Sequence, residues 1–186
     1  MRAIRTLIAA VMVSSMLFAG SSPAQAEERR CTGTIGSRTL DDVKVPAGKT
    51  CKLNGTTVKG TIKVNRNARL FAEDVRVVGN VQAENARRVE VRGSRVGGSV
   101  QVVQGRRALI RRVRVNGDIL FDDQRRKVEA IRNTVGGSIQ AFQNTGGVVI
   151  RKNVVDSNLQ CKENDPKPRG GGNKVEGSKE DQCQNL

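Results

Sequence analysis

The fold is decided by a repeating stretch, one copy of which reads Val96-Gly-Gly-Ser-Val-Gln-Val-Val-Gln-Gly-Arg-Arg-Ala-Leu-Ile-Arg-Arg-Val-Arg-Val115. Each copy opens on a Val-x-Gly triplet, and successive triplets are separated by 19, 19, 19, 20, 20 and 20 residues. The triplets lie at 58–60, 77–79, 96–98, 115–117 and 135–137, with weaker copies at 155–157 and 175–177. Repeats of this length are typical of folds in which one structural unit stacks on the next.

Apolar and polar residues alternate within each copy, which is the period of a half-buried β-strand. Two residues after the glycine stand Ile62, Val81, Val100, Ile119, Ile139 and Leu159, and two residues further stand Val64, Ala83, Val102, Phe121, Ala141 and Cys161. A second alternating pair follows later in each copy, such as Val89 and Val91. The pattern predicts two or three short strands in each copy and no helix.

Such short strands cannot bury an apolar face alone, so we expect each copy to stack on the previous one. The predicted fold class is all-β, a single-stranded parallel β-solenoid of about 7–8 coils with 19–20-residue repeats. A β-sandwich is the alternative, although a sandwich does not keep a regular repeat in its sequence. A right-handed coil is favoured over a left-handed hexapeptide helix, because parallel crossovers are right-handed and each coil holds only one hexapeptide-like piece.

Three columns of the repeat predict tight corners. The glycine that closes each triplet suits a corner with positive φ. The next column holds small polar side chains that can hydrogen-bond from coil to coil, namely Thr61, Asn80, Ser99, Asp118, Ser138, Asn158 and Ser178. A further column with Ser94, Asn133 and Asn153 predicts a second ladder of this kind.

Residues 1–26 have the three parts of a bacterial-type secretory signal peptide. A basic start is followed by an apolar run from Thr6 to Ala19 and by the small-x-small site Ala24-Gln-Ala26. We predict cleavage after Ala26 and a secreted, extracellular chain without a membrane span, with a retained N-terminal anchor as the alternative. Cleavage removes two arginines and lowers the net charge from +15 to +13.

The four cysteines lie near the two ends of the exported part, where disulfides are the default. Cys31 and Cys51 are one repeat apart, and we expect them to occupy one column of successive coils and to form a bridge. Cys161 and Cys183 flank an insertion and are expected to form the second bridge. A metal site is the alternative, but the cysteines lack C-x-x-C spacing. These pairings divide the chain into N-terminal coils with a disulfide cap (27–56), β-solenoid repeats (57–160) and a C-terminal disulfide cap (161–186).

The block from Val77 to Leu186 resembles small secreted bacterial β-solenoid proteins. The resemblance rests on Gly79-Asn-Val-Gln-Ala83, Gly98-Ser-Val-Gln101, Gly137-Ser-Ile-Gln-Ala-Phe-Gln143, Gln160-Cys-Lys-Glu-Asn164 and the tail from Gly171 to Cys183. It implies a solenoid fold and export, and no activity. The wider architecture is similar to the polymer-forming bactofilins, which usually lack export signals and disulfides at their ends.

The composition excludes most catalytic classes. The chain has 186 residues and no His, so imidazole-based hydrolysis and histidine metal sites are excluded. The aspartate pair of the repeats, Asp122-Asp123, is interpreted as an exposed turn that pairs with Arg125 or Arg126, although a carbohydrate-active carboxylate pair is the alternative. We predict no enzyme, no metal and no cofactor.

Arginines recur in register along the repeats. One corner column contains Arg69, Arg87, Arg88, Arg106, Arg107, Arg125 and Arg126, and a second contains Arg92, Arg111 and Arg151, with Arg112, Arg132 and Lys152 beside it. A ladder of like charges repels itself unless it is solvated or paired with anions. We therefore expect these arginines to bind a linear polyanion, while a merely solvated surface is the simpler interpretation.

The predicted function is a secreted structural or binding module that attaches electrostatically to an anionic cell-wall polymer or an acidic polysaccharide. A self-assembling extracellular structural protein is the alternative, and a His-free carbohydrate-active enzyme is a weaker one. Specific nucleic-acid binding is not expected, because no recognition helix and few stacking aromatics are present. Capped ends favour a monomer over a filament.

Overall fold

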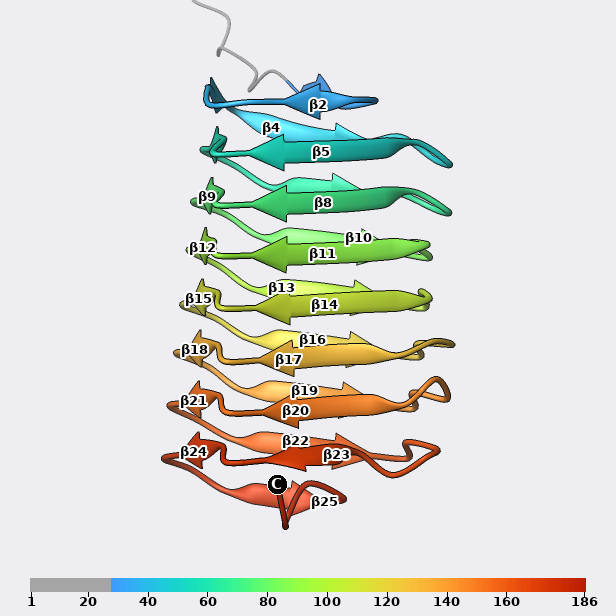
Figure 1. Ribbon diagram of the computed structural model, residues 1–186, viewed down its shortest axis with the longest axis vertical. Helices are drawn as coiled ribbons and strands as arrows, with labels where there is room; N and C mark the ends of the chain where they lie inside the picture. The colour runs from blue at the N-terminus through green and yellow to red at the C-terminus, as the bar shows by residue number, and fades with distance from the viewer. Residues whose placement is uncertain (1–27) are drawn as a thin grey trace, which may run out of the picture.

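The computed structural model describes residues 28–186, which form an all-β parallel solenoid of three sheets (Figure 1). Sheet A contains β1 (Glu28–Arg30), β4 (Asp42–Val45), β7 (Ile62–Val64), β10 (Val81–Glu84), β13 (Val100–Val103), β16 (Ile119–Asp122), β19 (Ile139–Phe142), β22 (Leu159–Lys162) and β25 (Lys179–Asp181). Sheet B contains β2 (Thr34–Ile35), β5 (Thr50–Asn54), β8 (Arg69–Glu73), β11 (Arg88–Arg92), β14 (Arg107–Arg111), β17 (Val128–Ile131), β20 (Val148–Arg151) and β23 (Arg169–Gly171). Sheet C contains β3 (Thr39–Leu40), β6 (Thr57–Val58), β9 (Arg76–Val77), β12 (Arg95–Val96), β15 (Arg114–Val115), β18 (Thr134–Val135), β21 (Val154–Val155) and β24 (Lys174–Val175).

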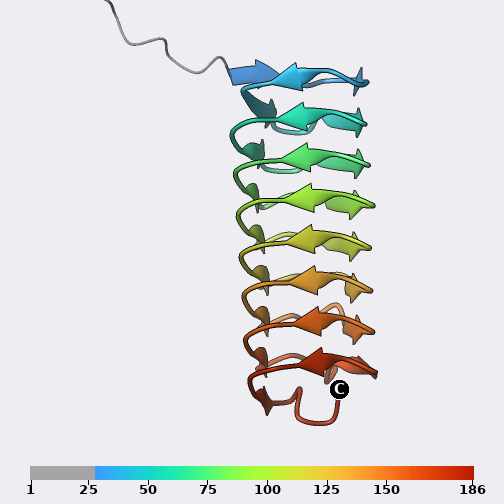
Figure 2. The ribbon, with the colours of Figure 1, turned by 90° about the vertical axis from the view of Figure 1, so that its left-hand side faces the viewer.

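Each coil visits the three sheets in the order A, B, C, and every strand pairs in parallel with its counterpart one coil away. Sheet B faces the viewer in Figure 1 with arrows pointing left, and sheet A lies behind it with arrows pointing right. The chain therefore turns clockwise as it moves away from its N-terminal end, which is a right-handed winding. The short strands of sheet C close the coil on the side that faces the viewer in Figure 2.

The core is a set of aliphatic stacks inside the coil. Val81 pairs with Val100 in sheet A and Val89 pairs with Ala108 in sheet B, and all four side chains are fully buried. Sheet C contributes one inward valine per coil, from Val58 through Val77, Val96, Val115 and Val135 to Val155. The alternation predicted from the sequence thus produces a narrow continuous core, and Phe121 is its only fully buried aromatic side chain among the described residues.

The small polar column forms the predicted ladder at the corner between sheets C and A. The Asp118 N–H donates to Ser99 Oγ at 3.0 Å, and the Ser138 N–H donates to Asp118 Oδ1 at 2.7 Å. The same bond recurs in every coil from Thr61 to Ser178. Each polar side chain therefore satisfies a backbone donor of the next coil.

A second ladder lies between sheets B and C, as the sequence predicts. Asn133, Asn153 and Asn173 are buried in one column, and Asn153 Nδ2 donates to Ala130 O and to Asn173 Oδ1, both at 2.9 Å. An equivalent column between sheets A and B, which the sequence reasoning missed, contains Gln124, Asn144, Asn164 and Gln182. Buried amides thus hold together the corners of the C-terminal coils.

The prediction of positive φ at the triplet glycines is wrong. None of Gly60, Gly79, Gly98, Gly117 and Gly137 adopts a positive φ. They are glycine because the previous coil is too close, since a Cβ on Gly98 would overlap Asn80 Oδ1 and lie 3.0 Å from the Gly79 carbonyl oxygen. Positive φ instead recurs at other corner positions, which are mostly not glycine, such as Asn85, Gln104, Arg112 and Arg132.

Both predicted disulfides form, with Cα–Cα distances of 5.4 Å for Cys31–Cys51 and 5.2 Å for Cys161–Cys183. The reasoning for the first bridge is wrong in one respect, because the two cysteines do not share a column. Cys31 continues sheet A, where its N–H donates to Lys44 O, whereas Cys51 belongs to sheet B and pairs with Leu70. The bridge therefore joins two sheets across a corner of the first coils.

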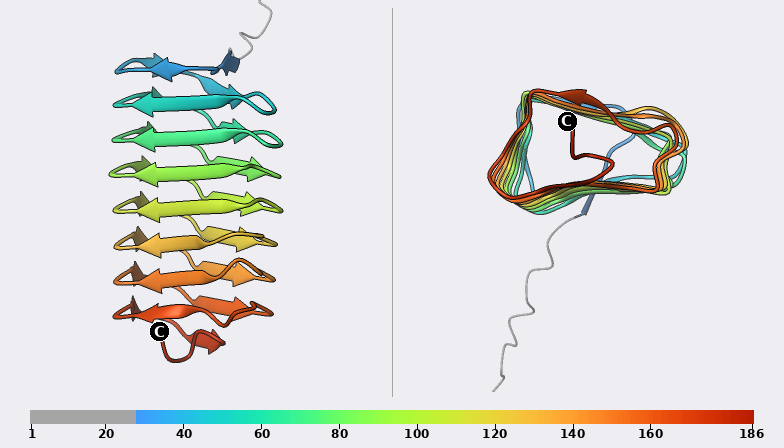
Figure 3. Two further views of the ribbon diagram at one scale, coloured as in Figure 1. Left: turned by 45° about the vertical axis from the view of Figure 1, so that its right-hand side comes forward. Right: turned by 90° about the horizontal axis from the view of Figure 1, so that it is seen from below.

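The C-terminal residues turn back under the last coil. Cys183 and Leu186 are buried, and the view from below shows the C-terminus inside the outline of the coils (Figure 3). Residues 28–186 contain no helix that is long and apolar enough to cross a membrane. The predicted signal peptide, residues 1–26, lies outside the described residues.

Candidate functional site

A groove lined only by arginines runs along the corner between sheets A and B. It has a volume of about 610 Å³ and is lined by Arg69, Arg87, Arg88, Arg106, Arg107 and Arg126. Arg69, Arg88 and Arg107 begin three successive strands of sheet B and pair in register. Arg87 and Arg106 come from the turns that precede β11 and β14, and Arg126 comes from the turn that precedes β17. The coil spacing of about 4.8 Å thus repeats a guanidinium along the solenoid axis.

Carboxylates are scarce in this arginine groove. Of its six arginines only Arg88 forms an ion pair within residues 28–186, with Glu90 of the same strand. Arg88 also lies over the Phe71 ring, with 5.3 Å between Cζ and the ring centroid. The remaining guanidiniums have no carboxylate partner in the described chain, so their mutual repulsion is balanced only by solvent and counterions.

Arg125 lies in an adjoining hollow of about 440 Å³, on the same corner. Arg66, Arg106 and Arg126 also line this hollow, together with the polar side chains of Asn67, Asn85 and Gln104. All seven arginines predicted for the first column therefore gather at one corner of the coil.

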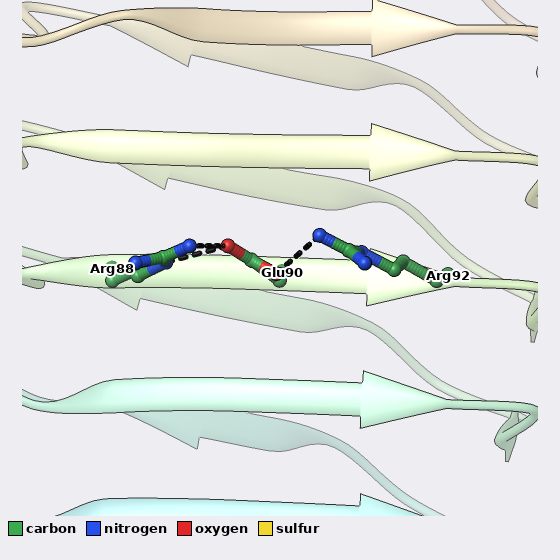
Figure 4. Close-up of polar contacts among 3 residues, drawn as sticks. All are labelled: Arg88, Glu90 and Arg92. Carbon is green, nitrogen blue, oxygen red and sulfur yellow. Dashed lines mark hydrogen bonds and ion pairs between the residues drawn. The ribbon is translucent and has the colours of Figure 1, made fainter.

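The second predicted column lies at the opposite edge of sheet B. Arg92 pairs with Arg111, but Ile131 follows in this column before Arg151 resumes it, so the column is interrupted. Figure 4 shows Arg88 and Arg92 on either side of Glu90, and Arg92 Nη2 lies 2.8 Å from Glu90 Oε2. The Nε atoms of Arg92 and Arg111 are covered and have no hydrogen-bond partner in the described chain.

The nine predicted arginines therefore border sheet B on both sides. The column between the two edges alternates apolar and charged residues, in the order Lys52, Phe71, Glu90, Leu109, Glu129, Val149 and Arg169. Glu90 is 6% exposed and pairs with both of its arginine neighbours, so its charge is neutralised locally. The edge at the corner with sheet A has the higher density of unpaired cations.

Sequence reasoning missed a third row, which lies on the outer side of sheet C. Arg76, Arg95 and Arg114 pair in register, and all three are exposed. They line a shallow groove of about 360 Å³ with Val78, which is 53% exposed, and Asn116. The signal was present in the sequence, because each arginine directly precedes the valine of a Val-x-Gly triplet.

Sheet A differs from the basic faces. Its outward column contains four glutamines, Gln82, Gln101, Gln140 and Gln160, and Gln140 Nε2 donates to Gln160 Oε1 at 2.8 Å. Cations stand in this column only in the first coils of the described chain, as Arg30, Lys44 and Lys63. The positive charge is therefore concentrated at the two edges of sheet B and on sheet C.

The acidic pair does not behave as predicted. Neither Asp122 nor Asp123 forms an ion pair within residues 28–186, so the expected contact with Arg125 or Arg126 is absent. Asp122 ends β16, and Asp123 adopts a positive φ at the following corner. Within residues 28–186, no three His, Cys, Asp or Glu side chains lie close enough together to bind a metal ion.

Comparison with known proteins finds no match to a family model, a curated protein or a solved structure. The resemblance to secreted bacterial β-solenoid proteins and to bactofilins therefore stays a prediction, except for the solenoid fold that it implied.

Proposed function

We propose that the protein is a non-enzymatic binding module that attaches to a linear anionic polymer through the arginine groove between sheets A and B. The observation that carries the proposal is the lining of this groove. It consists of six arginines, and only one of them, Arg88, pairs with a carboxylate of the described chain. Carboxylates and phosphodiesters both suit the guanidinium, which binds oxyanions through two parallel hydrogen bonds.

The repeat of the solenoid favours an extended polymer over a small ligand. Successive arginines of one column stand about 4.8 Å apart, a spacing close to the length of one sugar in an extended glycan. A polymer lying along the axis meets an equivalent guanidinium at each coil. An acidic polysaccharide or an anionic cell-wall polymer has this repetition of charge.

Two disulfides are compatible with an extracellular location, where such bonds persist. We propose that the chain is exported by the signal peptide of residues 1–26 and acts outside the cell. Residues 182–186 turn back under the last coil and cover the core at that end. This arrangement supports a monomer over end-to-end assembly.

Retention on an immobilised polyuronate and on an immobilised phosphodiester polymer tests the proposal and distinguishes the two anion chemistries. The groove variant Arg87→Gln/Arg106→Gln/Arg126→Gln removes three exposed cations of the groove. The control variant Lys63→Gln/Lys162→Gln/Lys167→Gln removes three exposed cations elsewhere, so that both variants have the same net charge.

We expect the wild type to bind at least one of the two polymers. The affinity of the control variant should lie within about threefold of the wild-type affinity. The groove variant should bind at least tenfold more weakly. If six arginines make contact, the logarithm of the affinity should fall with the logarithm of the salt concentration with a slope of about −4. Equal weakening by both variants would show that bulk charge alone is responsible, and absence of retention at low salt would refute the proposal.

A further inference from the structure

The arginine row on sheet C lies at the other end of the coil from the arginine groove. In Figure 1 the sheet C strands β9, β12 and β15 stand at the left, whereas β8, β11 and β14 begin at the right. The view along the axis shows the same two positions at opposite ends of an elongated outline (Figure 3). Strand β11 alone separates them by about 15 Å.

The sheet C row has the features of an independent anion-binding surface. Arg76, Arg95 and Arg114 repeat at the coil spacing, are exposed, and form no ion pair within residues 28–186. Asn116 adds an amide to the same shallow groove. A polyanion that lies along the axis would therefore meet three cations here as well.

One extended polymer cannot follow both rows at once. Each row runs parallel to the axis, so a polymer strand in one row would have to turn and cross either sheet B or sheet A before it reached the other. Across sheet B it would meet the apolar side chains of Phe71 and Leu109 and the carboxylates of Glu90 and Glu129, and across sheet A it would meet the uncharged glutamine column. Two separate polymer strands can each lie along one row without crossing a sheet.

We propose that a single copy of the protein holds two anionic polymer strands, one in the arginine groove and one on sheet C, and so cross-links them. The proposal rests on the proposed function and adds a second site to it. No bond is made or broken, and the cross-link is electrostatic and reversible by salt.

A capture experiment tests the cross-link with alginate, a linear polyuronate, and with a phosphodiester polymer in a parallel arm. The full chain is loaded on the immobilised polymer, unbound protein is washed away, and a fluorescent preparation of the same polymer is added. The sheet C variant Arg76→Gln/Arg95→Gln/Arg114→Gln is compared with the wild type and with the lysine control variant Lys63→Gln/Lys162→Gln/Lys167→Gln. Circular dichroism shows whether each variant keeps its fold.

The wild type and the control should capture the fluorescent polymer. The sheet C variant should stay on the immobilised polymer through the arginine groove, and its capture of the second polymer should fall at least tenfold. Full capture by this variant would overturn the proposal, and would indicate bridging through the groove of a dimer. Wild-type protein that is retained without capturing a second polymer refutes the cross-link alone, whereas absence of retention refutes the proposed function as well.

Discussion

The buried asparagine ladder between sheets B and C should contribute a large share of the stability of the C-terminal coils. The substitution that tests it is Asn153→Val, because the same column holds a buried valine at Val113. The change therefore introduces an apolar residue whose shape this column already accommodates, and it removes the amide.

The cost follows from the four hydrogen bonds of the Asn153 side chain. Its Nδ2 donates to Ala130 O and to Asn173 Oδ1, and its Oδ1 accepts from the backbone N–H of Asn133 and from Asn133 Nδ2. The N–H of Asn133 is left buried without a partner, which costs about 1–3 kcal/mol. With the weaker bonds included, we expect a loss of about 3 kcal/mol in the free energy of unfolding.

Thermal unfolding followed by circular dichroism, together with urea denaturation, measures this loss. A protein of this size should melt about 6–12 °C lower after a change of this magnitude. Asn116→Ala, an exposed asparagine of the next corner, is the control and should change stability by less than about 0.5 kcal/mol. A loss below about 1 kcal/mol for Asn153→Val would refute the view that the amide ladder holds these coils together.

Three other substitutions test separate features of the molecule. Gly98→Ala should lower the melting temperature, with a cost of about 1–3 kcal/mol, because its Cβ would overlap the polar ladder of the coil above, and an unchanged melt would contradict this explanation. Cys31→Ala/Cys51→Ala opens a loop of about 20 residues and should cost about 3 kcal/mol in urea denaturation, whereas an unchanged midpoint would show that the first coils need no bridge. Glu90→Gln should strengthen polyuronate binding about threefold at low salt. This is the repulsion in water between one carboxylate of the protein and one anionic group of the polymer about 7 Å away, and weaker binding would contradict the role of the arginine groove. Glu129→Gln is its control, since that carboxylate pairs with a lysine outside the groove lining.

The features that could be predicted from the sequence are those in which equivalent positions of successive coils hold side chains of the same chemical type. Ser99, Asp118 and Ser138 are all small and polar, so their stacking predicts the hydrogen bonds that the structure contains. The inward strands were predictable for the same reason, because alternation sets the buried face without any knowledge of the corners. The cysteine pairs were predicted from their separation of about one coil, although Cys31 and Cys51 lie in different sheets.

The features that could not be predicted depend on the shape of the corners. The sequence predicts positive φ at the triplet glycines, but the structure shows that a Cβ on Gly98 would overlap Asn80 Oδ1 and lie 3.0 Å from the Gly79 carbonyl oxygen. Nothing in the sequence shows that distance. Likewise the sequence does not show that the two arginine columns lie at opposite edges of sheet B, where β11 places Arg88 and Arg92 at its two ends.

The length of the arginine rows explains why two sites are useful on one small protein. The sheet C row ends where Thr134 follows Arg114, and the groove column ends near Gly146, where a Cβ would overlap the backbone of Arg126. Each row therefore spans about three coils, so an exposed polyanion strand gains only a few screened contacts from it. In a polymer network, a copy held on one strand by one row meets neighbouring strands at a raised effective concentration for its other row, without lengthening either row. A short solenoid with cations at both ends of its coil is thus better suited to joining polymer strands than to holding one strand tightly.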